Sequence, residues 1–197
     1  MSPSPSMAGD GVVVLERKTI MPGESVACWQ PTEISTLLGS CVSACLWDSR
    51  LKIGGMNHFM LPDSPGTGGG LGDATKSLRY GLYAMERLIN DLLLMGAKRD
   101  TLVAKVFGGA NITGALNAQH VGRRNADFVT EFLWNDKIKT AAADLGGEHS
   151  RRIKFNTHSG AVRVERVASA DSLAAKQERA YRETLQQDPV DGDIVFF

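Results

Sequence analysis

The segment from residue 33 to residue 60 constrains the fold more than any other, because its composition is that of β-strands. Most of its residues are β-branched, small or apolar, and turn-forming residues interrupt them at Gly39, at 48–49 and at 54–55. The pattern predicts a strand, a hairpin-like reversal near residues 48–52 and a second strand.

The clearest helix follows the glycine-rich segment 62–73, which we expect to be a loop. Asp73 is a suitable N-cap, and Gly96 is a suitable C-terminal glycine. Apolar residues recur between them at spacings of three and four, which predicts one buried stripe made of Leu78, Leu82, Met85, Ile89 and Leu92.

Shorter patterns predict the other elements. Strands are expected at 11–18, 102–107, 138–143, 152–157 and 161–167, and helices at 121–133 and 169–187. The last helix is polar, and its candidate anchors are Leu173, Tyr181 and Leu185. Strands therefore outnumber helices, and we expect an α/β fold.

A length of 197 residues suits one domain with irregular ends. We expect residues 1–10 to be a disordered N-terminus, 11–167 to form the folded domain, and 168–197 to form a C-terminal helix and tail. Basic and acidic residues are equal in number at 22 each, so no bulk charge favours nucleic acid or an anionic membrane surface. No apolar stretch is long enough for membrane insertion and no signal peptide is evident, so a cytoplasmic protein is expected.

Three cysteines, Cys28, Cys41 and Cys45, are an odd number and are better explained as free thiols than as a disulfide framework. If the two predicted strands pair across their reversal, Cys41 and His58 lie at the same end of neighbouring strands. An imidazole there could take the thiol proton, and a neighbouring imidazolium lowers the pKa of a cysteine. The pair therefore suggests nucleophilic acyl transfer.

Such a pair needs a third group to orient the imidazole, and the hydroxyls of Ser35 and Thr36 are candidates. Two other interpretations use the same cysteines. Cys28, Cys41, Cys45 and His58 could bind zinc, although they lack the paired C-x-x-C spacing of ordinary zinc sites. Alternatively Cys41 and Cys45 only fill the core, which is the interpretation we favour for Cys45.

Several separate segments, in order, resemble the CheD family, the chemoreceptor glutamine deamidases of bacterial chemotaxis. The resemblance covers roughly residues 30–165. It rests on LGSCV, GGMNHFMLP, YGLYAMERLINDLLLMGA, AKVFGGAN, GRRNADF and DLGGEHSRRIKF. It implies a single-domain sandwich of mixed β-sheets with flanking helices, similar to the cytotoxic necrotizing factor deamidases, and an enzyme that needs no metal or cofactor.

The resemblance also implies the site residues. Cys41 becomes the nucleophile and His58 the base, and the family's third residue, a threonine six positions before the cysteine, corresponds to Ser35. Side chains alternate in an extended strand, so the even separation of Ser35 from Cys41 favours Ser35, whereas a bulge at Gly39 would favour Thr36 instead. The residues expected to contact the substrate are Gly39, Ser40, Phe107, Gly108 and Asn125, and backbone N–H groups near Gly39 to Cys41 are expected to stabilise the oxyanion.

The partners implied are the cytoplasmic helices of methyl-accepting chemoreceptors and, in some species, a CheC-like phosphatase. The expected reaction is hydrolysis of a receptor glutamine to glutamate through a thioester. The alternative is a regulatory binding module with little turnover. Cys41 and His58 discriminate between them, because a pure binding protein needs neither.

Overall fold

The computed structural model describes residues 14–62, 71–112 and 116–187. The predicted disordered N-terminus at 1–10 and the end of the predicted tail lie outside the described residues. The strands are β1 (Glu16–Thr19), β2 (Ser25–Cys28), β3 (Thr32–Leu38), β4 (Val42–Asp48), β5 (Ile53–Asn57), β6 (Leu102–Gly108), β7 (Lys139–Leu145), β8 (Arg151–Asn156) and β9 (Val162–Arg166). The helices are α1 (Leu71–Leu94), α2 (Leu116–Asn135) and α3 (Asp171–Gln187), with short 3₁₀ turns at Arg99–Thr101 and Ala168–Ala170.

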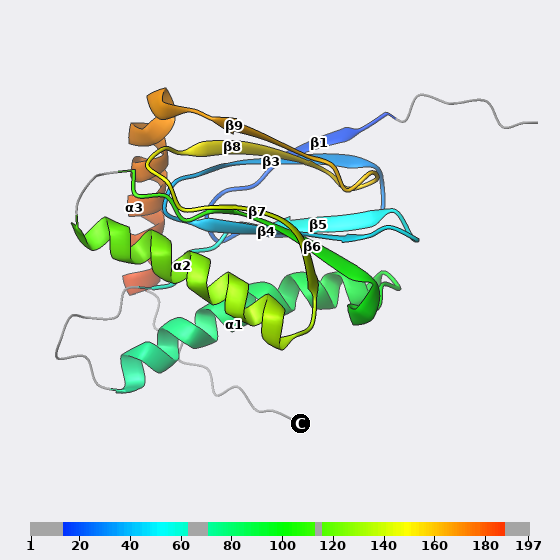
Figure 1. Cartoon of the computed structure of the whole chain (residues 1–197), viewed down its shortest axis with the longest axis horizontal. Helices are drawn as coiled ribbons and strands as arrows, with labels where there is room; N and C mark the ends of the chain where they lie inside the picture. Colours follow the sequence, from blue (N-terminus) through cyan, green and yellow to red (C-terminus); the bar gives the residue numbers. More distant parts are fainter. Residues whose placement is uncertain (1–13, 63–70, 113–115, 188–197) are drawn as a thin grey trace, which may run out of the picture.

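The strands form two mixed sheets. One sheet has the order β1-β3-β8-β9 and the other β2-β5-β4-β6-β7. The two sheets lie face to face, α1 and α2 cover the outer face of the five-stranded sheet, and α3 runs across one end of both sheets (Figure 1). The predicted α/β architecture of mixed sheets with flanking helices is confirmed.

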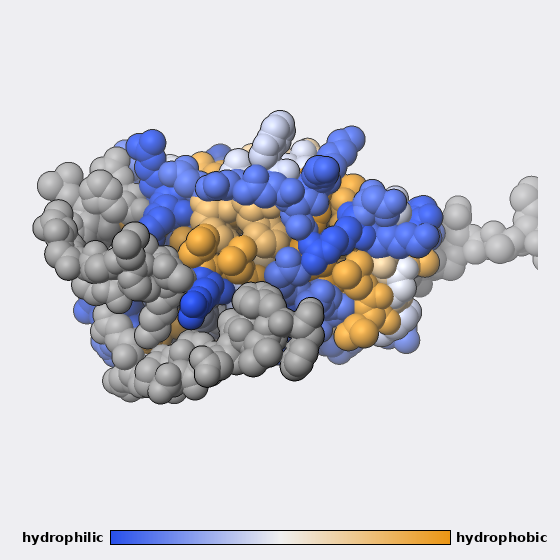
Figure 2. Space-filling model, turned by 90° about the horizontal axis from the view of Figure 1, so that it is seen from below, coloured by the Kyte–Doolittle hydropathy of each residue, from blue (hydrophilic) through white to orange (hydrophobic). Residues whose placement is uncertain are grey.

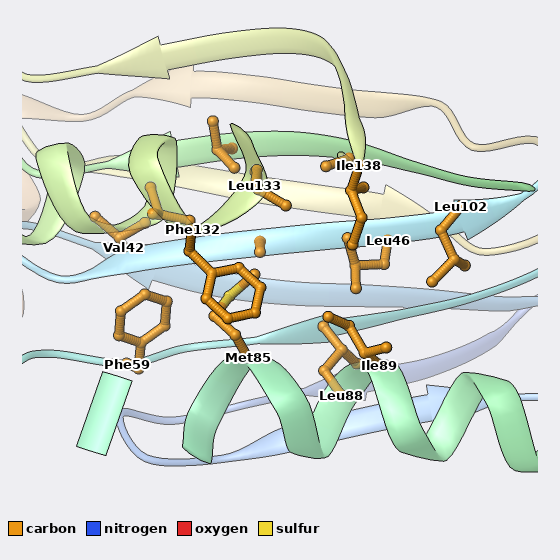
Figure 3. Close-up of a cluster of buried hydrophobic side chains, with 14 of the residues drawn as sticks. Val42, Leu46, Phe59, Met85, Leu88, Ile89, Leu102, Phe132, Leu133 and Ile138 are labelled. Carbon is orange, nitrogen blue, oxygen red and sulfur yellow. The ribbon is translucent and has the colours of Figure 1, made fainter. Parts of the chain in front are cut away.

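The helix layer is held by an apolar cluster. Met85, Leu88 and Ile89 of α1 project toward Val42 and Leu46 of β4 (Figure 3), and all five are fully buried. The predicted stripe is right at Met85, Ile89 and Leu92 and wrong at its start, since Leu78 and Leu82 are 51% and 39% exposed. The helix begins at Leu71, so Asp73 lies inside it and is not the N-cap.

A second apolar cluster fills the space between the two sheets. Ile34 and Leu38 of β3 meet Cys45 of β4 and Phe155 of β8 there. Because β4 is covered by α1 and α2 on one face and by the other sheet on the opposite face, six of its seven residues are buried. Cys45 is fully buried in this cluster, as the core-filling interpretation predicts.

The segment 33–60 differs from its prediction in one respect. The reversal is confirmed, since β4 and β5 pair antiparallel with Asp48 opposite Ile53. The residues before it, however, form two strands in different sheets, because the chain leaves β3 at Leu38 and crosses to the other sheet before β4 begins. The unpredicted strand β2 completes the edge of the five-stranded sheet beside β5.

The C-terminal helix uses different anchors from those predicted. Leu173 is 49% exposed, whereas the buried residues on this side are Ala170, Ala174 and Glu178, one helical turn apart. Only Tyr181 among the predicted anchors packs against the cluster between the sheets.

No helix in the described part of the chain is long and apolar enough to span a membrane. The outer face of the molecule on the side of α1 carries apolar areas among hydrophilic ones (Figure 2). Exposed apolar side chains of α1 include Leu78, Tyr83 and Leu94.

Candidate active site

A tight bend at Gly39–Cys41 carries the chain from one sheet to the other. The end of β6 supports it from behind: Gly109 N–H donates to the carbonyl of Cys41, and Ala110 N–H donates to that of Gly39, both at 2.8 Å. Gly108 has a φ of +115°, and a Cβ there would come within 2.2 Å of the Cys41 carbonyl oxygen. Only glycine therefore allows the two segments to approach this closely.

The segment after β5 places His58 beside this bend. Phe59 and Val42 exchange two backbone hydrogen bonds of 3.0 Å, which fixes His58 next to Cys41 across the strands. Cys41 Sγ, a ring nitrogen of His58 and a carboxylate oxygen of Glu178 lie within 4.8 Å of one another. This spacing allows proton transfer after a small adjustment, which is usual for a site without substrate.

Thr36 orients the imidazole. Its hydroxyl lies 2.8 Å from Nδ1 of His58 and donates to the carbonyl of Ile20 at 2.7 Å. A hydroxyl has one proton, so Thr36 can only accept from His58, and Nδ1 carries the hydrogen. The other nitrogen, Nε2, then bears the lone pair; it is buried and has no hydrogen-bond partner among the described residues. Nε2 is therefore available as a base.

The sequence favoured Ser35 over Thr36 as the residue that orients His58. This is wrong, because the hydroxyl that reaches the imidazole is that of Thr36. The Ser35 hydroxyl lies 3.0 Å from that of Thr19 and 3.3 Å from the carbonyl of Lys18, on the opposite side of β3. Counting an even separation from Cys41 fails because the bend at Gly39–Cys41 ends the strand before Cys41 is reached. The alternation within β3 itself would have given the answer, since Ile34, Thr36 and Leu38 are buried together.

Glu178 of α3 is the main feature that the sequence did not reveal. One carboxylate oxygen accepts from the N–H groups of Gly39 and Cys41 at 3.0 and 2.9 Å. The other accepts from the N–H and hydroxyl of Ser40 at 3.0 and 2.6 Å. The backbone donors expected to form an oxyanion hole thus converge on one point, and a carboxylate occupies it. No sequence pattern singles out Glu178, because the burial of one glutamate in a polar helix cannot be read from the sequence.

The electrostatics of the pair differ from the expected thiolate and imidazolium. Burial raises the pKa of the Cys41 thiol, and the Glu178 carboxylate raises it further, while the Arg182 cation acts in the opposite direction. Burial lowers the pKa of His58 to about 3. In this conformation both groups are neutral at pH 7.

The other residues predicted to contact substrate support the site from behind. Phe107 is buried in the cluster between the sheets. The Asn125 amide is fully buried, donates to the carbonyl of Ser40 at 2.8 Å and accepts from Leu61 N–H at 2.9 Å. Asn125 therefore joins the bend to the segment after His58 and positions both, while its contact with substrate stays a prediction.

The four ligands of the alternative zinc interpretation do not come together. Among the described residues, the grouping of possible ligands contains Cys41, His58 and Glu178 but neither Cys28 nor Cys45. Both oxygens of Glu178 already accept two hydrogen bonds each, which leaves them poorly suited to bind a metal in this arrangement.

Comparison with known proteins places the chain in a family. The model of the family described as "CheD chemotactic sensory transduction" matches residues 60–166. This chain belongs to the CheD family. The match begins after Cys41 and His58, so it does not itself assign their roles.

Curated relatives cover nearly the whole chain. A protein of Shewanella oneidensis named "Probable chemoreceptor glutamine deamidase CheD 1" is 44% identical over 179 residues, which is 90% of this chain and 86% of the relative. A protein of Thiobacillus denitrificans named "Probable chemoreceptor glutamine deamidase CheD" is 43% identical over 92% of this chain and 90% of the relative.

Proposed function

We propose that this chain is a protein-glutamine deamidase that converts glutamines in the cytoplasmic helices of chemoreceptors to glutamates. The names of its CheD relatives support the reaction and the class of substrate. The observation that carries the proposal is the convergence of the Cys41 thiol, the His58 imidazole and the N–H groups of Gly39–Cys41 on one point.

The geometry supports a thioester mechanism. Nε2 of His58 takes the proton from Cys41, and the thiolate attacks the carbonyl carbon of the glutamine carboxamide. The N–H groups of Gly39 and Cys41 stabilise the oxyanion, and Thr36 holds the imidazole in the tautomer that can accept the proton. His58 then protonates the leaving ammonia, and water hydrolyses the thioester to release glutamate. No step requires a metal or a cofactor.

A regulatory binding module with little turnover is the less favoured alternative. A binding surface has no need for an oriented imidazole beside a buried thiol. The CheC-like phosphatase stays a prediction from the family resemblance, as does a kinship of the fold with the cytotoxic necrotizing factor deamidases.

Mass spectrometry of a chemoreceptor cytoplasmic fragment co-expressed with this chain tests the proposal. We expect specific glutamines to gain about one dalton, and Cys41→Ala and His58→Ala to slow this by a thousandfold or more, as an order of magnitude. Cys28→Ala is the matched control, because Cys28 is buried away from the site and the variant should keep its activity. Unchanged deamidation in a folded Cys41→Ala variant would exclude the mechanism.

A further inference from the structure

The Glu178 side chain lies where a substrate side chain would have to bind. Its carboxylate accepts from the N–H groups of Gly39, Ser40 and Cys41 and from the Ser40 hydroxyl, and it lies within 4.8 Å of the thiol and the imidazole. These donors come from the bend that carries the nucleophile. They are therefore the same donors that a reacting carbonyl requires.

A glutamate held in this position is chemically the product of glutamine deamidation. Glutamine and glutamate side chains have the same length, so a glutamine at position 178 would place its carbonyl oxygen at the N–H groups of Gly39 and Cys41. The carboxamide nitrogen would then face Ser40, whose hydroxyl can accept from it but whose N–H cannot donate to it. The carboxylate satisfies every donor, and a carboxamide would leave one unsatisfied.

The helix that carries Glu178 has few apolar contacts to hold it. Its inward-facing residue Ala174 and Ala170 in the turn before it are small, and Leu173 is half exposed. Tyr181 packs closely on Gly23, where an added Cβ would come within 2.5 Å of the ring, and Gly23 N–H donates to the carbonyl of His58 at 2.7 Å. The surface beneath α3 therefore reaches from the Cys41 bend to the turn that backs His58. Asp171 at the start of α3 accepts from Ser150 N–H at 2.7 Å, so polar contacts hold both the start and the middle of the helix. Small apolar contacts combined with polar ones favour reversible docking over permanent burial.

We propose that α3 is an internal product mimic: it occupies the docking groove of the substrate helix, with Glu178 in the place of the target side chain. This inference rests on the proposed function and adds to it that a receptor helix binds by displacing α3. The target glutamine is presented on an intact helix, with a small residue one turn before it, as Ala174 precedes Glu178. While α3 is docked, the enzyme is inactive.

The charge of Glu178 agrees with an inactive docked state. Burial under α3 and the negative charge of Glu178 both raise the pKa of Cys41, so the thiol stays protonated. When α3 leaves, water and the departure of the carboxylate both favour the thiolate.

The reactivity of Cys41 toward iodoacetamide tests the docking of α3 without requiring any deamidase activity. In the intact chain we expect Glu178→Ala to speed alkylation of Cys41 on the order of tenfold or more, as counted by peptide mass spectrometry. Glu183→Ala is the matched control, because Glu183 lies on the exposed side of the same helix. Buried Cys45 is the internal reference for global unfolding. An unchanged Cys41 rate, with Cys45 still protected, would overturn the proposal.

The near-isosteric variant Glu178→Gln tests the product mimicry itself. Cys41 should attack the new carboxamide, its C–N bond should break with release of ammonia, and water should cleave the thioester to restore glutamate. We expect residue 178 to gain about one dalton with time in this variant but not in Glu178→Gln/Cys41→Ala. If the Glu178→Gln variant deamidates its receptor but keeps the glutamine at position 178, the product mimicry is refuted and the proposed function is not. Failure of receptor deamidation would instead refute the proposed function, and the alkylation result would still stand.

Discussion

Helices α1 and α3 both cover the sandwich, but different chemistry holds each of them in place. α1 buries Met85, Leu88 and Ile89 completely against β4, and one side-chain amide of the sheet, that of Asn57, adds a hydrogen bond to the carbonyl of Ala84 at 3.0 Å. α3 presents a small alanine and two carboxylates. Asp171 at its start accepts from Ser150 N–H at 2.7 Å, and Glu178 makes the central contact, a set of hydrogen bonds to backbone donors of the site.

The difference indicates which of the two helices another helix can displace. Apolar contact of the α1 type is lost only by exposing the core to water, which costs several kcal/mol for a few large side chains. Hydrogen bonds of the α3 type can be replaced by water or by a competing side chain at a small net cost. α1 is therefore part of the fold, and α3 can leave while the fold stays intact.

The largest expected effect tests this contrast through stability. Leu88→Ala should lower the free energy of unfolding by about 2–5 kcal/mol, because it opens a cavity in the core beneath α1. Glu178→Ala should change it by only about 1 kcal/mol or less, since the freed N–H groups can take water once α3 moves. Urea unfolding monitored by circular dichroism measures both. If Glu178→Ala costs as much as Leu88→Ala, the two helices are equivalent and the contrast fails.

The next effect concerns pH, because the candidate active site contains a buried neutral histidine, His58. The pKa of His58 falls to about 3 in the folded chain from about 6.5 in an unfolded one, so protonation favours unfolding. The free energy of unfolding that depends on a neutral His58 is fully present above about pH 6.5 and decreases as the pH falls toward 3. Between pH 7.5 and pH 5.0 we expect a loss of about 2 kcal/mol from this group alone.

His58→Gln isolates that contribution, because it removes the titrating group and keeps a polar side chain. The difference in unfolding free energy between the two pH values should be about 2 kcal/mol smaller in His58→Gln than in the unmodified chain. All other titrating groups are present in both proteins, so their contributions should cancel in this comparison. An identical pH dependence in the two proteins would show that His58 is not buried as a neutral group.

The apolar contacts beneath α1 could be predicted from the sequence better than the polar contacts beneath α3. The reversal between β4 and β5 and the end of the α1 stripe follow from local periodicity, and both are confirmed. Leu78 and Leu82 continue the same periodicity but are exposed, because the buried face of this part of the helix runs through Ser77 and Gly81 instead.

The polar contacts of the site join segments that are distant in the sequence. The periodicity within one segment does not reveal such contacts. Cys41 and His58 could be paired because one hairpin connects them. Glu178 lies far along the chain, and its neighbours Ala174 and Leu173 gave no indication of which side of the helix faces the site. The choice between Ser35 and Thr36 failed for a related reason, since a change of sheet lies between β3 and Cys41.

A smaller effect distinguishes the two faces of β3. Thr36→Ala should slow deamidation on the order of tenfold, because His58 loses the acceptor that fixes its tautomer. Thr36→Ser should restore most of the rate, and the pH profile of kcat should shift in Thr36→Ala but not in Thr36→Ser. Ser35→Ala is the matched control on the opposite face and should leave the rate nearly unchanged. A larger loss in Ser35→Ala than in Thr36→Ala would contradict the assigned role of Thr36.

The smallest expected effect is that of a chelator. It tests whether the group formed by Cys41, His58 and Glu178 is a catalytic site or a metal site. Cys41, His58 and Glu178 include a thiol, an imidazole and a carboxylate, which are ligands that zinc accepts. Catalysis, however, needs the thiolate and the Nε2 lone pair to be free, and a bound ion would occupy both. We therefore expect incubation with EDTA to leave receptor deamidation unchanged, and elemental analysis to find no stoichiometric zinc in active protein. If one zinc per chain is removed together with the activity, and both return on adding zinc, the site is a metal centre and the thioester mechanism is wrong.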